Sequence, residues 1–210
     1  MLSRCWILVV FVAVAVIALG APAPIHGAAE NDAGKFVKEL GDKAINLLSV
    51  NGIADAERER RFRKLFRTNF DVEGIGRFTL GKYLRRTDKR QMSEFLKLFE
   101  DFIVVTYTSI FSEYSGETFS VRSVRSEPGR DTLVLTEILR TDGGPPYRVD
   151  WKVRRKNGAN KIIDVKVEGV SMTISQRAEF GSVIQRQGGV DGLILQLRTK
   201  TKFLYSAPRQ

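Results

Sequence analysis

The stretch Lys161–Phe180, KIIDVKVEGVSMTISQRAEF, decides the fold. Its first part alternates, because polar residues separate Ile163, Val165 and Val167, and this period of two is typical of a strand with one buried face. Gly169 interrupts the alternation before a polar, helix-compatible run. The apolar positions of that run are Ile174, Ala178 and Phe180. A strand that carries its apolar face through a bend into a helix predicts one wall of an apolar cavity.

The residues before this stretch predict further strands. Phe119 and Val121 begin one strand, and residues 131–141 form a second with three leucines on one side, Leu133, Leu135 and Leu139. Residues 147–154 alternate cleanly. The turns between strands are predicted at Pro128-Gly129, Gly143–Pro146 and Asn157-Gly158. Residues 117–170 therefore predict an antiparallel β-meander with short loops.

Helical periodicity flanks the meander on both sides. Predicted helices run from about residue 36 to 48, from an N-cap at Asp55, from Asp88 to Ser112, from near Ser175, and from a cap at Asp191. A further short helix is predicted within residues 70–86, with Ile75, Phe78 and Leu80 facing inward and a turn at Gly81. Helices, then a meander, then helices again predict an α+β fold, with the helices packed on one face of the sheet and an apolar cavity enclosed between them.

The helix predicted from Asp88 to Ser112 has an unusually wide apolar face. Gln91 follows Asp88 at capping-box spacing. Its inner stripe consists of Met92, Phe95, Phe99, Phe102, Ile103, Thr106 and Ile110, and further apolar residues widen it. A helix of this kind is either buried on several sides or borders a cavity.

The N-terminus has the features of a secretory signal peptide. A basic Arg4 precedes an apolar run from Cys5 to Leu19, which is shorter than the ~20 residues that span a bilayer. Small residues at 27–29 fit a cleavage site, although an uncleaved anchor is the alternative. We therefore expect a signal peptide over residues 1–29, export of the mature chain, a single α+β domain over 30–202 and a flexible tail over 203–210.

The charge balance indicates anionic partners. The net charge is +10. Because the chain is expected to be exported, this positive charge favours binding to anionic lipid surfaces or acidic proteins over binding to nucleic acid. Five basic residues crowd the helix expected after Asp55, namely Arg58, Arg60, Arg61, Arg63 and Lys64. The segment Arg58–Arg67 is either a solvated helix face or a docking surface.

Residue types argue against catalysis, cofactors and metals. Cleavage would remove the only Cys, Cys5, and the only His, His26, so thiolate or imidazole chemistry is not expected. Ser171 lacks the second glycine of a nucleophile elbow and is expected to bond the backbone at the bend. A carboxylate hydrolase is the enzyme alternative. Its candidate pairs are Asp71 with Glu73, and Asp164 with Glu168, although alternation places the second pair opposite the apolar wall.

Several motifs together resemble the MlaC or toluene-tolerance (Ttg2-type) family of periplasmic lipid-binding proteins. They are Phe70-Asp71, Arg77–Tyr83, the Phe95 and Phe99 helix with Thr106-Tyr107, the segment from Asp164 to Ser171, and the segment from Gly192 to Leu197. The resemblance covers roughly residues 35–200. It implies a carrier of phospholipid between an inner-membrane ABC transporter of MCE type and an outer-membrane lipoprotein complex. A hopanoid or another polycyclic lipid is the alternative cargo.

The candidate cavity wall follows from the apolar faces. Because each methylene exposed to water costs ~0.8 kcal/mol, a lipid carrier needs a dry cavity with the head group near solvent. The expected lipid-binding residues are Leu80, Tyr83, Phe99, Ile103, Tyr107, Tyr147, Val149, Trp151, Val153, Val165, Val167 and Val170. Lys82 and Arg85 are expected at the rim, beside the head group.

Overall fold

The computed structural model describes residues 26–48, 50, 52–108, 116–129 and 131–206. Its helices are α1 (His26–Leu48), α2 (Asp55–Asn69), α3 (Val72–Thr79), the 3-10 helix η1 (Gly81–Arg86), α4 (Lys89–Thr108), α5 (Met172–Arg186) and α6 (Val190–Ser206). Its strands are β1 (Thr118–Ser126), β2 (Asp131–Leu139), β3 (Tyr147–Lys156), β4 (Ala159–Val167) and the short β5 (Val170–Ser171).

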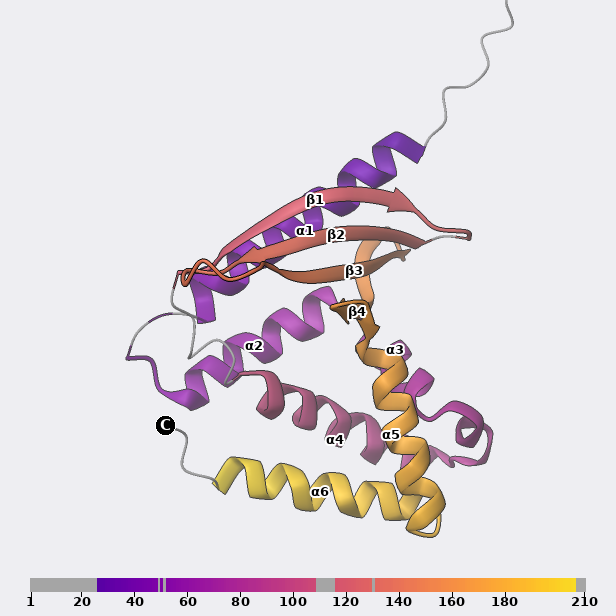
Figure 1. Cartoon of the computed structure of the whole chain (residues 1–210). Helices are drawn as coiled ribbons and strands as arrows, with labels where there is room; N and C mark the ends of the chain where they lie inside the picture. The colour runs from indigo at the N-terminus through magenta and orange to yellow at the C-terminus, as the bar shows by residue number, and fades with distance from the viewer. Residues whose placement is uncertain (1–25, 49, 51, 109–115, 130, 207–210) are drawn as a thin grey trace, which may run out of the picture.

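The five strands form one antiparallel sheet in the order of the chain, β1-β2-β3-β4-β5, so the predicted α+β meander is confirmed. Helix α1 runs along the sheet, α2 lies below it, and α4 and α6 lie lower still (Figure 1). Helix α5 descends from the sheet to the level of α6 (Figure 1). The helices thus separate into a part that covers the sheet and a part that packs against itself.

A β-bulge in β4 corrects the predicted strand pattern. The register between β3 and β4 shifts, so that Lys152 pairs with Asp164 while Val153 pairs with Ile162. Ile163 is the extra residue, and Ile162 is therefore the fully buried one. Val165 still faces inward opposite Trp151. The prediction that Ile163 belongs to the buried face is wrong, because strict alternation does not continue through a bulge.

The inner face of β2 also differs from the prediction. Val134 and Thr136 are buried, and Val134 pairs with Trp151 across the strands. Leu133, Leu135 and Leu139 do share one side, but it is the outer face, where Leu139 is 46% exposed. Threonine is a common strand residue, and here Thr136 satisfies its buried hydroxyl by donating to the carbonyl oxygen of Val149.

The lower helices pack around phenylalanines. The rings of Phe95 and Phe180 meet edge to face, with centroids 5.9 Å apart. Phe99 meets Phe180 in the same way at 6.3 Å. Helices α3 and α4 approach closely at Gly76, where a Cβ atom would lie 2.6 Å from Leu96 Cδ2. The glycine leaves room for Leu96, whose side chain would have to move if a larger residue stood at position 76.

The bend after β4 is fixed by side chains. Ser171 Oγ accepts a hydrogen bond from Ile174 N at 3.1 Å and donates to Asp164 Oδ2 at 2.7 Å, so the predicted role of Ser171 is confirmed. This N-cap starts α5 at Met172, before the predicted start near Ser175. Consequently Ile174 lies on the exposed side of α5, 61% exposed, and only Phe180 of the three predicted apolar positions is buried.

Other helix ends agree in part with the prediction. Asp88 and Gln91 form the predicted capping box, with Asp88 Oδ1 accepting from Gln91 N at 2.8 Å. The N-cap of α2 is Ala54 rather than Asp55, which is the first helical residue. Helix α6 continues to Ser206, into the predicted tail, because Leu204 packs on the lower core and Tyr205 accepts from Arg63. Residues 109–112 and 207–210 lie outside the described residues.

Most of the predicted signal peptide also lies outside the described residues, which begin at His26. Helix α1 starts there, so the predicted cleavage after Ala29 would remove its first turn. Among the described helices, none combines the length and apolar content that crossing a bilayer requires.

Candidate functional site: an apolar cavity between sheet and helices

A cavity of about 280 Å³ lies where the sheet faces the lower helices. It is lined by Phe62, Phe66, Phe70, Ile75, Thr79, Phe99, Ile103, Tyr107, Trp151, Asp164, Val165, Val167, Met172, Thr173 and Gln176. These residues come from α2, α3, α4, α5 and the central strands β3 and β4, with Phe70 in the link between α2 and α3. The wall is predominantly apolar.

The cavity separates two hydrophobic clusters. The upper cluster packs α1 and α2 on the sheet around Ile162 and Val134. The lower cluster packs α3, α4, α5 and α6 around Phe95 and Phe180. Trp151 and Val165 adjoin the upper cluster, whereas Phe99 belongs to the lower one. The cavity is therefore the space left where two separately packed layers meet.

The polar groups on the wall are mostly satisfied within the protein. Trp151 Nε1 donates to Thr136 Oγ1 at 3.1 Å, and Thr79 Oγ1 donates to the carbonyl oxygen of Gly76 at 2.7 Å. Burial raises the pKa of the Tyr107 hydroxyl, so this group stays protonated and uncharged at neutral pH. A wall of this kind offers an organic guest apolar contact and little directional bonding.

Six of the twelve predicted wall residues line this cavity: Phe99, Ile103, Tyr107, Trp151, Val165 and Val167. They come from the two elements on which the prediction depended most, the wide aromatic helix and the strands β3 and β4. The structure thus brings together, on one wall, residues that are up to 68 positions apart in the chain.

The other six predicted wall residues lie elsewhere. Leu80, Val149 and Val153 are buried, but outside the cavity lining. Tyr83 packs on the lower cluster from η1. Tyr147 is 48% exposed beneath the guanidinium of Arg140, and Val170 is 54% exposed after the β4–β5 turn. Alternation identified the correct face of β3, but the cavity occupies only the middle of that face.

The predicted rim residues do not border the cavity. Lys82 and Arg85 are exposed on η1 and are absent from the cavity lining. The Lys82 ammonium lies 5.2 Å from the centroid of the neighbouring Tyr83 ring.

The sequence interpretation missed the aromatic face of α2. Phe62, Phe66 and Phe70 are spaced four residues apart, so they form one stripe along the helix and its end. The rings of Phe66 and Phe70 have centroids 4.9 Å apart. This spacing of four is the signal in the sequence that indicates a shared apolar face on α2. The other missed lining residues are Ile75, Thr79, Asp164, Met172, Thr173 and Gln176.

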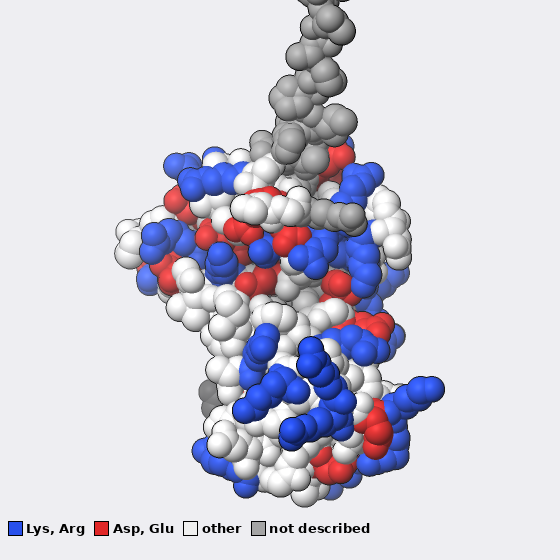
Figure 2. Space-filling view, turned by 90° about the vertical axis from the view of Figure 1, so that its right-hand side faces the viewer, with Lys and Arg blue, Asp and Glu red and all other residues white. Residues whose placement is uncertain are grey.

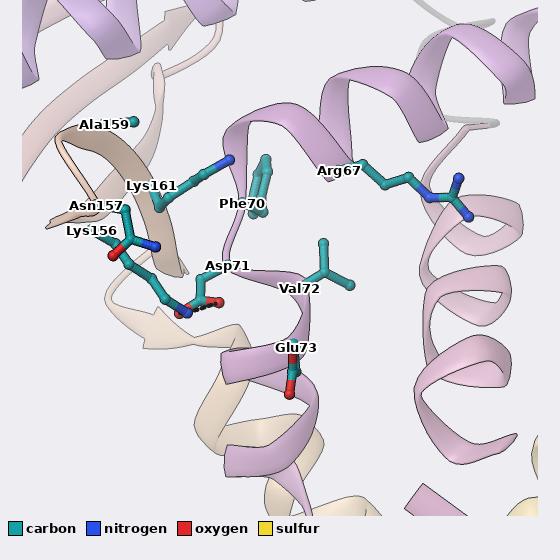
Figure 3. A pocket seen from close by; sticks show the side chains of 9 residues that line it. All are labelled: Arg67, Phe70, Asp71, Val72, Glu73, Lys156, Asn157, Ala159 and Lys161. Atoms are coloured by element: carbon teal, nitrogen blue, oxygen red, sulfur yellow. Dashed lines mark hydrogen bonds and ion pairs between the residues drawn. The ribbon is translucent and has the colours of Figure 1, made fainter. Parts of the chain in front are cut away.

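The first candidate carboxylate pair does not form a catalytic site. Asp71 caps α3 by accepting from Gly74 N at 3.2 Å, and its oxygens lie 2.9 and 3.0 Å from Lys156 Nζ. Glu73 points away from Asp71 in the hollow that both border, and it pairs with Arg77 instead (Figure 3). In the same hollow Arg67 points away from Lys156 and toward α4 (Figure 3). These charged groups do not converge on a common point.

The second candidate pair is also occupied by structural bonds. Asp164 is buried at the cavity, contrary to the prediction that it lies away from the apolar wall. Its carboxylate accepts from Ser171 Oγ, from Thr173 N at 3.1 Å and from Thr173 Oγ1 at 2.8 Å. Glu168 instead accepts from Arg148, whose backbone and side-chain hydrogen bonds lower the pKa of that carboxyl.

The basic segment of α2 is largely neutralised by ion pairs. Arg60 and Arg61 pair with Glu57, and Arg58 pairs with Asp55. Two further pairs connect α2 with α4, because Arg63 and Arg67 both contact Glu100. The arginines of this segment are therefore paired, and two of them connect α2 with α4.

An α+β domain that keeps an apolar hollow between its sheet and its helices has the design of a binding protein for an apolar ligand. Residues 38–199, most of the chain, match the protein family described as MlaC protein. The chain belongs to the MlaC family.

Individual relatives agree with this assignment. The chain is 22% identical over 170 residues to the intermembrane phospholipid transport system binding protein MlaC of Haemophilus influenzae, covering 78% of this chain and 79% of that protein. It is 24% identical over 119 residues to the toluene tolerance protein ttg2D of Pseudomonas putida, covering 56% and 55%. A solved structure of the phospholipid-binding protein from Ralstonia solanacearum, in complex with a phospholipid, has the same fold with a TM-score of 0.76 at 18% identity, covering 83% of this chain and 99% of that one.

Proposed function

We propose that this protein is an MlaC-type intermembrane phospholipid transport binding protein, a carrier and not an enzyme. The observation that carries the proposal is the apolar cavity between sheet and helices, in a chain whose family and fold are those of phospholipid-binding relatives. The acyl chains of the lipid occupy this cavity, against Phe99, Ile103, Trp151 and Val165. The head group remains near solvent, because burying an unpaired phosphate is costly.

The size of the cavity sets how much lipid this conformation accepts. A volume of about 280 Å³ equals the liquid volume of about nine water molecules, and a methylene group has a similar size. At ~0.8 kcal/mol for each methylene removed from water, such a segment gains on the order of 7 kcal/mol. A two-tailed phospholipid therefore requires a wider cavity, and the boundary between the two clusters is the place where widening breaks the fewest contacts.

The biological setting follows the family. We propose that the protein works in the periplasm after removal of residues 1–29, and that it passes lipid between an inner-membrane transporter of MCE type and an outer-membrane lipoprotein complex. The hopanoid alternative finds no support in the relatives, whose names specify phospholipid. Phospholipid is therefore the cargo that we propose.

The test is to identify what the purified protein carries. Native mass spectrometry of the protein from expressing cells, followed by lipid extraction, should find phospholipid bound to the wild type. In Val165→Phe a ring fills part of the cavity, and we expect lipid occupancy to fall to less than about half. The matched control is Ile163→Phe, two residues away at the bulge and outside the cavity lining, which should keep its lipid. Protein that is repeatedly empty, or equal losses in both variants, would refute the proposal.

A further inference from the structure

Four basic side chains and two apolar side chains are exposed on one surface. It consists of Lys82, Arg85 and Arg86 of η1, Arg177 of α5, and the exposed apolar residues Phe78 and Ile174, and we call it the η1–α5 surface. Within the described part of the chain, none of its four cations has a carboxylate at ion-pair distance, whereas the arginines of α2 do.

Arg177 connects α5 with α3 and with the start of η1. The Arg177 guanidinium lies 4.9 Å from the centroid of the Phe78 ring. The same side chain lies against the start of η1, because a Cβ atom on Gly81 would be 2.8 Å from Arg177 Nε. Figure 2 shows long basic side chains together in the middle of the lower part of this face, where most of the surface is white and some red lies to their right and below them, whereas red and blue intermingle over the sheet above.

The acidic residues that flank these cations in the chain have other partners. Glu73 pairs with Arg77, and Asp88 accepts from the backbone N–H of Gln91. Glu179 accepts from Gln176 and lies 3.7 Å from Lys200. The positive charge of the η1–α5 surface is therefore available to a partner outside the molecule.

Apolar side chains among these cations indicate what kind of partner fits. Phe78 is 42% exposed and Ile174 is 61% exposed. Basic residues interspersed with exposed phenylalanine and aliphatic groups are typical of surfaces that lie at a membrane interface, where the cations meet lipid phosphates and the apolar groups enter the acyl boundary.

We propose that the η1–α5 surface docks this protein on an anionic phospholipid bilayer. Two of the helices that carry it, α3 with Phe78 and α5 with Arg177 and Ile174, also form part of the cavity wall, because α3 contributes Thr79 and α5 contributes Gln176 to the lining. Docking therefore places the wall of the cavity against the membrane. Lys82 and Arg85 then contact the head groups of the bilayer and not the head group of a lipid inside the cavity.

The experiment is co-sedimentation with vesicles, using protein processed by the expressing cell. One vesicle set contains about 30% phosphatidylglycerol in phosphatidylcholine, and the other contains phosphatidylcholine alone. The double variant Arg85→Gln, Arg86→Gln removes two cations from the η1–α5 surface. The matched control, Arg60→Gln with Lys64→Gln, removes the same charge from α2.

We expect the wild type and the α2 control to bind anionic vesicles, with binding that weakens as salt increases. The η1 variant should bind them at least about tenfold more weakly. Equal weakening of both variants would overturn the proposal, because binding would then follow net charge. Absence of wild-type binding to anionic vesicles would also overturn the proposal. An acidic protein would then be the partner of the η1–α5 surface. Lipid content measured on the same samples tests the proposed function separately.

Discussion

Asp131 illustrates how single charged residues stabilise the sheet. Its side chain is only 7% exposed at the start of β2. Arg154 donates to it from Nε at 2.6 Å and from Nη2 at 2.8 Å, and Lys152 Nζ lies 3.3 Å away. Hydrogen bonds from Arg154 lower the pKa of Asp131. A buried carboxylate of this kind stabilises the fold only while it is ionised.

The lowered pKa gives a pH dependence whose sign is fixed. Asp131 contributes its full stabilisation above the unfolded pKa of about 3.8, and this contribution is lost as the pH falls through the lower folded pKa. We expect Asp131→Asn to lower the free energy of unfolding by about 1–3 kcal/mol at pH 7, with a difference from wild type that shrinks below about pH 4. Urea denaturation across this range measures it.

Asp42→Asn serves as the control for this prediction. Asp42 makes an exposed ion pair with Lys38 on α1, and such pairs contribute about 0–1 kcal/mol. A difference between wild type and Asp131→Asn that stays constant from pH 7 down to about pH 3 would contradict the linkage.

At the scale of elements, Asp164 connects the sheet to α5. Its carboxylate sits on β4 and binds the first turn of the helix through Ser171 and Thr173. Asp164 follows the bulge residue Ile163 in β4 and pairs with Lys152 across the strands. The junction holds one side of the cavity, to which Asp164, Thr173 and Gln176 all contribute.

Removing this connection should loosen the start of α5. We expect Asp164→Ala to lower the free energy of unfolding by about 2–4 kcal/mol, because donors at Ser171 and Thr173 lose a buried acceptor. Hydrogen exchange should accelerate in the first turn of α5 more than in α6. Asp150→Ala, on the neighbouring strand β3, is the control and should change little. Similar effects of both substitutions would argue against a specific role of Asp164.

At the scale of the whole molecule, the cavity lies between two clusters that share few residues. Phe70 packs against both, and further contacts between the layers run through α2, α3 and α5. An empty space in a protein interior costs van der Waals contacts, so a guest that fills it stabilises the folded state by mass action.

Lipid removal should therefore reduce thermal stability. A ligand at about 100 times its Kd contributes about 2.7 kcal/mol, which corresponds to a Tm change of roughly 5–10 °C for a chain of this size. We expect protein stripped of lipid by detergent exchange to melt lower by this amount, as measured by calorimetry. In Val165→Phe the ring already occupies part of the cavity, so the same treatment should change Tm less. Identical Tm values before and after stripping of the wild type would contradict the prediction.

Much of the fold could be predicted from the sequence, because its signals are local. The period of two in residues 147–154 and the capping box at Asp88 and Gln91 each depend on residues a few positions apart. The Ser171 cap is equally local. The wide aromatic face of α4 indicated a cavity, because packing against one neighbouring element would not bury so much apolar surface on one helix. These signals were sufficient for the meander, most helices and half of the predicted wall.

The tertiary structure decided what depends on several elements at once. The bulge becomes apparent only in the pairing of β3 with β4, and it places Ile162 in the core instead of Ile163. Only the approach of α4 to α2 shows that Arg63 and Arg67 of the basic segment pair with Glu100. The sequence by itself determined the amphipathic elements and their order. The cavity is the volume that these elements fail to fill when they pack, so its lining depends on their relative positions, which local periodicity does not specify.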